Sequence, residues 1–94
     1  MANANQNRAY IYTKECNLCG NTEAYAHSAK RLQAKGKEVF VKQVSLFAGW
    51  TAEAEEIGLE MPFVLDYDTM HKATCADLDN MSEEELEEWL GIRS

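Results

Sequence analysis

The spacing of hydrophobic residues along the first half of the chain changes twice, from that of a strand to that of a helix and back. A β-branched and aromatic run favours a strand over 8–13. From Leu18 to Leu32, apolar and small residues recur at three- and four-residue spacing, which predicts a helix that Gly36 ends. The next apolar run, over 38–44, is continuous, as expected of a strand covered on both faces. Strand, helix and strand predict a βαβ unit with parallel strands and a right-handed crossover.

The second half predicts shorter elements. A short helix is expected over 51–57, with Gly58 closing it. The only proline, Pro62, precedes an apolar strand over 63–65, where a missing N–H is tolerated at the first position. A turn then leads to a candidate strand over 69–73. These elements extend the predicted sheet to four strands.

A last helix has a clear start and stop. Ser82 is followed three residues later by Glu85, the pattern of a capping box. The helix is expected to end at Gly91. The predicted order is therefore β-α-β-α-β-β-α, in one domain spanning 1–94, and the polar residues 1–7 are predicted to be a disordered tail.

Composition excludes several classes of partner. The formal net charge of −7 argues against nucleic acid and against anionic membrane surfaces. No apolar run approaches the length that spans a bilayer, and the polar start lacks the apolar core of a secretory signal. Three cysteines are an odd number, whereas a disulfide-stapled secreted scaffold uses a larger, even set. We expect a monomer in the cytoplasm.

The candidate chemistry lies in Cys16-Asn17-Leu18-Cys19, between the first predicted strand and the first predicted helix. Two thiols three residues apart in a first helical turn lie on one side and can close a small disulfide. Free N–H groups at a helix start stabilise the thiolate of the first cysteine, which lowers its pKa. This spacing in this context indicates redox chemistry.

Three segments give the chain a resemblance to glutaredoxins, a branch of the thioredoxin fold. The run 11–14 leading into the two cysteines resembles the family's strand, lysine and active-site pair. The segment 61–64, with Pro62, is similar to the cis-proline and third strand. The segment 74–78 resembles the part before the last helix. The resemblance covers about 10–78 and implies a four-stranded mixed sheet flanked by helices.

The resemblance also implies an enzymatic mechanism and a set of site residues. Cys16 would attack a disulfide in a protein or a small thiol compound, and Cys19 would resolve the mixed disulfide. A thiol or a reductase would return the electrons, with no bound cofactor. Glutathione is implied as a possible co-substrate, and the residues that the resemblance assigns to its binding are Lys14, Met61, Pro62, Cys75 and Asp77. The Met61–Pro62 bond is predicted to be cis.

Departures from the family pattern change the expected substrate. Asn17-Leu18 stands where the family usually has Pro-Tyr. Glu60 precedes Met61-Pro62, and three further glutamates lie in the second helix, at positions 53, 55 and 56. Because glutathione is anionic, these carboxylates predict weak glutathione binding.

Two other interpretations stay open. Cys16 and Cys19 are also half of a zinc site, for which Cys75 or His71, and also His27, are the remaining candidate ligands. The chain is also consistent with a thioredoxin-like module that binds a protein through its acidic face without catalysis.

Overall fold

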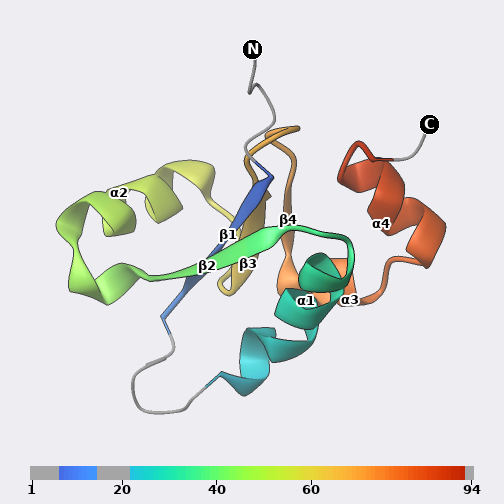
Figure 1. Ribbon diagram of the computed structural model, residues 1–94. Helices are drawn as coiled ribbons and strands as arrows, with labels where there is room; N and C mark the ends of the chain where they lie inside the picture. Colours follow the sequence, from blue (N-terminus) through green and yellow to red (C-terminus); the bar gives the residue numbers. More distant parts are fainter. Residues whose placement is uncertain (1–6, 15–21, 93–94) are drawn as a thin grey trace.

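The computed structural model describes residues 7–14 and 22–92, which form an α/β structure (Figure 1). The elements in chain order are β1 (Arg8–Thr13), α1 (Glu23–Ala34), β2 (Glu38–Gln43), the 3₁₀ helix η2 (Val44–Leu46), α2 (Ala48–Ile57), β3 (Phe63–Asp66), β4 (Lys72–Thr74), α3 (Cys75–Asp79) and α4 (Glu83–Trp89).

The four strands form one mixed sheet in the order β2-β1-β3-β4. β1 and β2 are parallel, with Tyr10 opposite Phe40. β3 is antiparallel to β1, with Leu65 opposite Tyr10, and β4 is antiparallel to β3. The predicted parallel strand–helix–strand unit and the four-stranded mixed sheet are confirmed.

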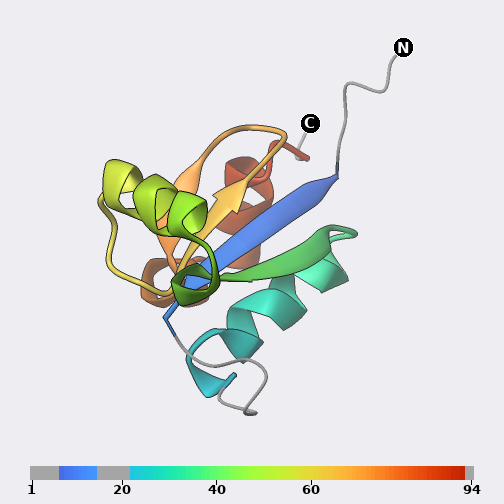
Figure 2. The ribbon, with the colours of Figure 1, turned by 90° about the vertical axis from the view of Figure 1, so that its left-hand side faces the viewer.

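Helices cover both faces of the sheet (Figures 1 and 2). Residues alternate along a strand between the two faces. Ala9 and Ile11 of β1 therefore contribute to a core with α1, α3 and α4, whereas Tyr12 contributes to a second core against α2. The largest buried side chains of the first core are Ile11, Leu32, Leu78, Leu86 and Leu90, and the second core includes Tyr12 and Phe63, whose rings stack.

Several element boundaries differ from the predicted ones. α1 begins, among the described residues, at Glu23, α2 begins at Ala48 and β2 ends at Gln43. The prediction that the fourth strand covers 69–73 is wrong, because β4 is Lys72–Thr74. Asp66 causes the shift, since its Oδ2 accepts hydrogen bonds from the N–H and Oγ1 of Thr69 and holds that residue in the turn.

The short helix α3 was not predicted as a helix. Thr74 precedes it as N-cap, and its Oγ1 accepts a hydrogen bond from the N–H of Asp77 at 3.1 Å. By contrast, the predicted capping box of α4 is confirmed, because Ser82 and Glu85 each accept from the other's backbone N–H. Gly58 closes α2 in the left-handed conformation, as predicted.

A buried ion pair closes the end of the sheet remote from the β1–α1 connection. Lys37 Nζ lies 3.0 Å from Asp66 Oδ1 and also contacts Asp68, and the side chains of Lys37 and Asp66 are almost fully buried. Asn7, predicted as the last tail residue, donates its backbone N–H to Asp68 and accepts from the N–H of Glu38. Residues 1–6 of the predicted tail lie outside the described residues.

We predict that Lys37→Ala destabilises the fold by about 3–5 kcal/mol, because it leaves the Asp66 carboxylate buried without its cation. Urea unfolding followed by circular dichroism measures this change. Lys30→Ala on exposed α1 surface is the matched control and should shift the free energy of unfolding by less than about 0.5 kcal/mol. Equal effects of the two substitutions would contradict the assigned role of the ion pair.

Candidate active site

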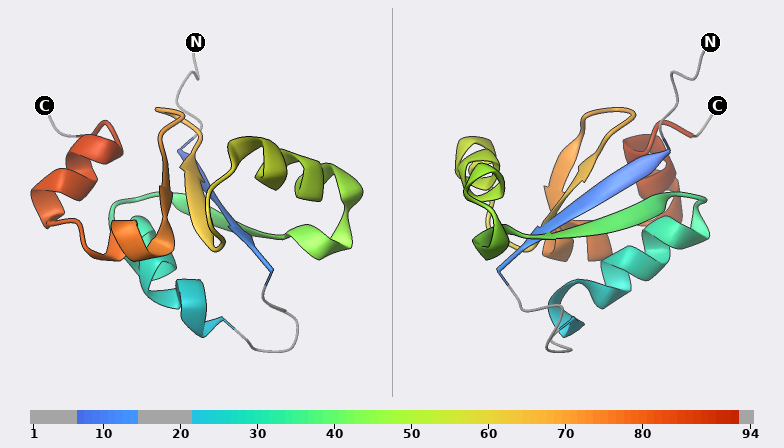
Figure 3. Two further views of the ribbon diagram at one scale, coloured as in Figure 1. Left: turned by 180° about the vertical axis from the view of Figure 1, so that it is seen from behind. Right: turned by 60° about the vertical axis from the view of Figure 1, so that its left-hand side comes forward.

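A groove of about 350 Å³ lies where β3, β4 and α3 meet the first turn of α1. Its lining residues are Ala24, Glu60, Met61, Pro62, Thr74, Cys75, Ala76 and Asp79. Figure 3 shows α3 beside α1 on this side of the molecule. Because β3 pairs with β1 so that Tyr12 lies opposite Phe63, continuation of this register brings the carboxyl end of β1 next to Pro62.

The peptide backbone fixes the floor of the groove. The Met61–Pro62 bond is cis, as predicted. The carbonyl oxygen of Pro62 accepts a hydrogen bond from the N–H of Cys75 at 2.9 Å. This bond holds the start of α3 against the segment before β3, so Met61, Pro62 and Cys75 line one groove.

Cys75 lines the groove, but its side chain belongs to the core between the sheet and the helices. It is 2% exposed and packs in the same cluster as Tyr25 and Leu78. Burial raises the pKa of the Cys75 thiol; a hydrogen bond from Ser28 opposes this shift and the charge of Asp79 adds to it. The described environment therefore keeps this thiol protonated at neutral pH.

One polar residue that joins α3 to α1 near the groove, Ser28, was missed in the sequence. Ser28 Oγ donates to Asp79 Oδ1 at 2.7 Å, and His27 Nδ1 lies 3.1 Å from the same oxygen. Arg31 donates to the carbonyl oxygen of Leu78. These contacts join α3 to α1. The spacing of residues in the sequence could have revealed Ser28, because it falls on the same helix face as Tyr25 and Leu32. In the structure its side chain is fully buried.

The structure brings together only part of the predicted glutathione set. Lys14, at the end of β1, and Asp77, in the first turn of α3, are exposed and do not line the groove. Cys16 and Cys19 lie outside the described residues. The predicted start of the first helix at Leu18 is wrong, because α1 begins at Glu23 with Thr22 as its N-cap. Stabilisation of the Cys16 thiolate by free N–H groups stays a prediction.

The described residues that line the groove include two acidic side chains. Of the four glutamates that were predicted to form an acidic rim, only Glu60 is one of them. Glu60 and Asp79 line it, and none of the other described lining residues is Lys or Arg. The glutamates of α2 do not line it; Glu53 instead accepts hydrogen bonds from Tyr12 and Lys42 on the other face of the sheet. The expected acidic rim is therefore corrected to Glu60 and Asp79.

The two alternative partners for a zinc site lie at opposite ends of β4. His71 precedes Lys72, and its Nδ1 lies 2.7 Å from the carbonyl oxygen of Trp89. Cys75 follows Thr74, and four residues of extended chain span about 13 Å. Within 7–14 and 22–92, no group of three His, Cys, Asp or Glu residues has metal-site geometry.

No protein family, curated protein or solved structure matches this chain. None of the helices in the described part of the chain is long and apolar enough to cross a bilayer.

We predict that Cys75 resists alkylation in the folded protein, because burial raises its pKa and little thiolate exists at pH 7. Iodoacetamide labelling followed by peptide mapping should modify Cys75 at least tenfold more slowly in buffer than in urea. Labelling at equal rates under the two conditions would show that the thiol is accessible.

Proposed function

We propose that this chain is a glutaredoxin-like thiol–disulfide oxidoreductase with a thioredoxin-like fold. The observation that carries the proposal is the parallel β1–α1–β2 unit, whose β1–α1 connection contains Cys16 and Cys19 in the sequence. The groove beside the carboxyl end of β1, with Met61 and Pro62 in its lining, supports it further. The order of strands and helices agrees with the one that the resemblance implies, apart from the additional α3.

The proposed reaction transfers two electrons from the cysteine pair to a substrate disulfide. The thiolate of Cys16 attacks one substrate sulfur, a new S–S bond forms, and the second substrate sulfur leaves as a thiolate that takes up a proton. Cys19 then loses its proton and attacks Cys16, which releases the first substrate sulfur as a thiol. The products are a reduced substrate and a Cys16–Cys19 disulfide. An external thiol, or a reductase that carries a dithiol, reduces this disulfide again.

The groove is the proposed place for the substrate next to the cysteine pair. Its apolar lining by Met61, Pro62 and Ala76 suits the stem of a disulfide-bonded side chain, while the carboxylates of Glu60 and Asp79 disfavour anionic substrates. Cys75 takes no part in the proposed chemistry, because its thiol is buried and its pKa is raised. A neutral or basic disulfide substrate is therefore favoured over a glutathione disulfide.

We predict that Cys16→Ser abolishes disulfide reduction, whereas Cys19→Ser retains the first half of the reaction and accumulates a mixed disulfide. Turnover of a disulfide-bonded protein with dithiothreitol as donor, and mass spectrometry of the trapped adduct, measure the two effects. Cys75→Ala is the matched control and should keep at least half of the activity. Full activity of Cys16→Ser, or a trapped adduct on Cys75, would contradict the assignment.

We predict that Glu60→Gln raises turnover with glutathione about twofold at low salt, because one exposed like-charge contact is worth a few tenths of a kcal/mol. The gain should shrink at 0.5 M NaCl because salt screens this contact. Glu55→Gln, on the exposed surface of α2 outside the groove, is the control and should leave turnover unchanged. If both variants gain equally, net charge and not the groove determines the effect.

A further inference from the structure

β4 forms one edge of the sheet and presents backbone groups outward. The N–H of Asp66 donates to the carbonyl of His71, and the N–H of Cys75 donates to that of Pro62, each at 2.9 Å. Hydrogen-bonded residues alternate along an antiparallel strand. His71, Ala73 and Cys75 thus direct their backbone toward β3. The N–H and C=O of Lys72 and the N–H of Thr74 face the open edge, whereas the C=O of Thr74, the N-cap of α3, belongs to the first turn of that helix.

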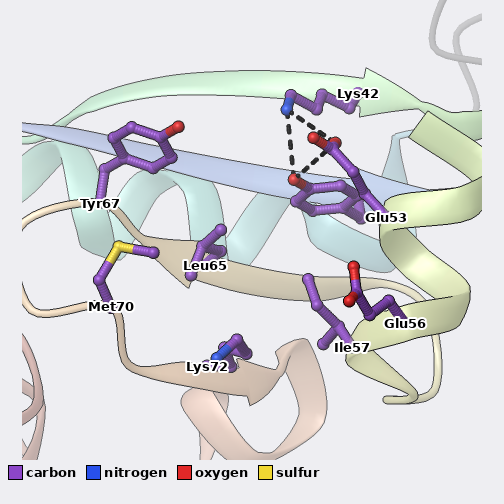
Figure 4. A pocket seen from close by; sticks show the side chains of 9 residues that line it. Lys42, Glu53, Glu56, Ile57, Leu65, Tyr67, Met70 and Lys72 are labelled. Atoms are coloured by element: carbon purple, nitrogen blue, oxygen red, sulfur yellow. Dashed lines mark hydrogen bonds and ion pairs between the residues drawn. The ribbon is translucent and has the colours of Figure 1, made fainter. Parts of the chain in front are cut away.

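A hollow of about 440 Å³ lies on the α2 side of this edge. Its apolar lining residues are Ile57, Leu65 and Met70, and the ring of Tyr67 adds to them. Figure 4 shows Tyr67 and Met70 on one side, Ile57 and Glu56 on the other, and Leu65 between them. Lys42 is already held here by Tyr12 and Glu53. Glu56 and Lys72 also line the hollow, so its surface is part apolar and part charged.

A second hollow, of about 490 Å³, lies on the α4 side of the same edge. It is lined by His71, Lys72, Met81, Glu85, Glu88 and Trp89. Glu85 Oε1 accepts the capping hydrogen bond from Ser82, whereas the carboxylate of Glu88 has no hydrogen-bond or ion-pair partner among the described residues. An indole ring with a carboxylate nearby suits a cationic side chain. Lys72 lines both hollows, so the two flank one short strand.

We propose that the β4 edge binds an extended, basic–apolar peptide segment of a partner protein as an added strand. Successive side chains of a strand point to opposite faces. An apolar side chain would enter the α2-side hollow, and its basic neighbour would enter the α4-side hollow beside Glu88 and Trp89. Main-chain bonds to Lys72 and Thr74 supply affinity, and the two hollows supply sequence preference. This proposal is independent of the cysteine chemistry.

The charge of the molecule favours a partner peptide over a second copy of this chain as the occupant of the β4 edge. The net charge of −7 and the carboxylates at Glu85 and Glu88 attract a basic segment. Pairing of two β4 edges would bring two α4 helices together, each with acidic residues at 83, 84, 85, 87 and 88. Like charges at that contact disfavour self-association through this edge.

The test is a titration of the full ¹⁵N-labelled chain with the blocked peptide acetyl-Thr-Val-Arg-Val-Thr-amide in dithiothreitol, followed by NMR. The peptide lacks cysteine, so binding cannot come from disulfide exchange. We expect shifts at residues 71–74 and 85–89, and slower hydrogen exchange of the Lys72 and Thr74 amides. Replacing the peptide's arginine by glutamate should abolish binding. Glu88→Gln should weaken it about two- to fivefold, and Glu55→Gln should not change it.

Backbone methylation separates strand addition from simple attraction of charges. In an added strand, the N–H groups of alternate residues point to the edge. One peptide is therefore methylated at the arginine nitrogen and a second at the two valine nitrogens. One of these two peptides should bind at least tenfold more weakly than the unmethylated peptide, and the other should lose less affinity. Equal loss with both patterns, absence of shifts at 71–74, or shifts centred on the Pro62 groove would overturn the proposal. Concentration-dependent shifts at β4 without peptide would also overturn it, in favour of a second copy.

Discussion

The fold depends on β1, one of the two central strands that are paired along both edges and buried on both faces. β2 and β3 flank it, and its alternate residues enter the two cores. Ala9 and Ile11 are fully buried on one face, and Tyr12 is almost fully buried on the other. A one-residue slip of this strand would exchange the two faces and place Tyr12 in the space that Ile11 fills. The register of β1 therefore fixes both layers of helices.

The same register determines where chemistry can be placed. In parallel strand–helix–strand units, the carboxyl end of the strand is open to solvent and leads into the connection to the helix. At the other end, β1 is closed by the contacts of Asn7 and by the buried pair of Lys37 and Asp66. Burial disfavours the charge on Lys37, but Asp68 and Asp66 outweigh this effect and raise its pKa. Lys37 is consequently charged at neutral pH, and on raising the pH its contribution to stability is lost only above the ordinary lysine pKa.

Sequence pattern was sufficient for elements whose determinants are local or strongly periodic. β1, the parallel partner β2, and α4 with its capping box follow from side chains next to one another in the chain. Sequence pattern was insufficient where a contact with a residue distant in the chain determines the local structure. Asp66 was predicted as a turn residue only, because nothing in the local sequence shows that Lys37, far upstream, will pair with it. The helix α3 is similarly short and gains its stability from contacts of Ser28 and Arg31 on α1.

The candidate site likewise has features that the sequence predicts and features that depend on distant contacts. The segment around Pro62 and Cys75 were both singled out in the sequence, and they line one groove. The protonation of the Cys75 thiol depends on residues that are distant in the sequence. The charge of the groove does so too, because Asp79 from α3 lines it in place of the expected glutamates of α2. α3 thus has two effects: its first residue, Cys75, is removed from chemistry by burial, while its last residue, Asp79, brings a carboxylate to the groove. A five-residue helix whose position depends on α1 therefore supplies one of the two carboxylates that line the groove.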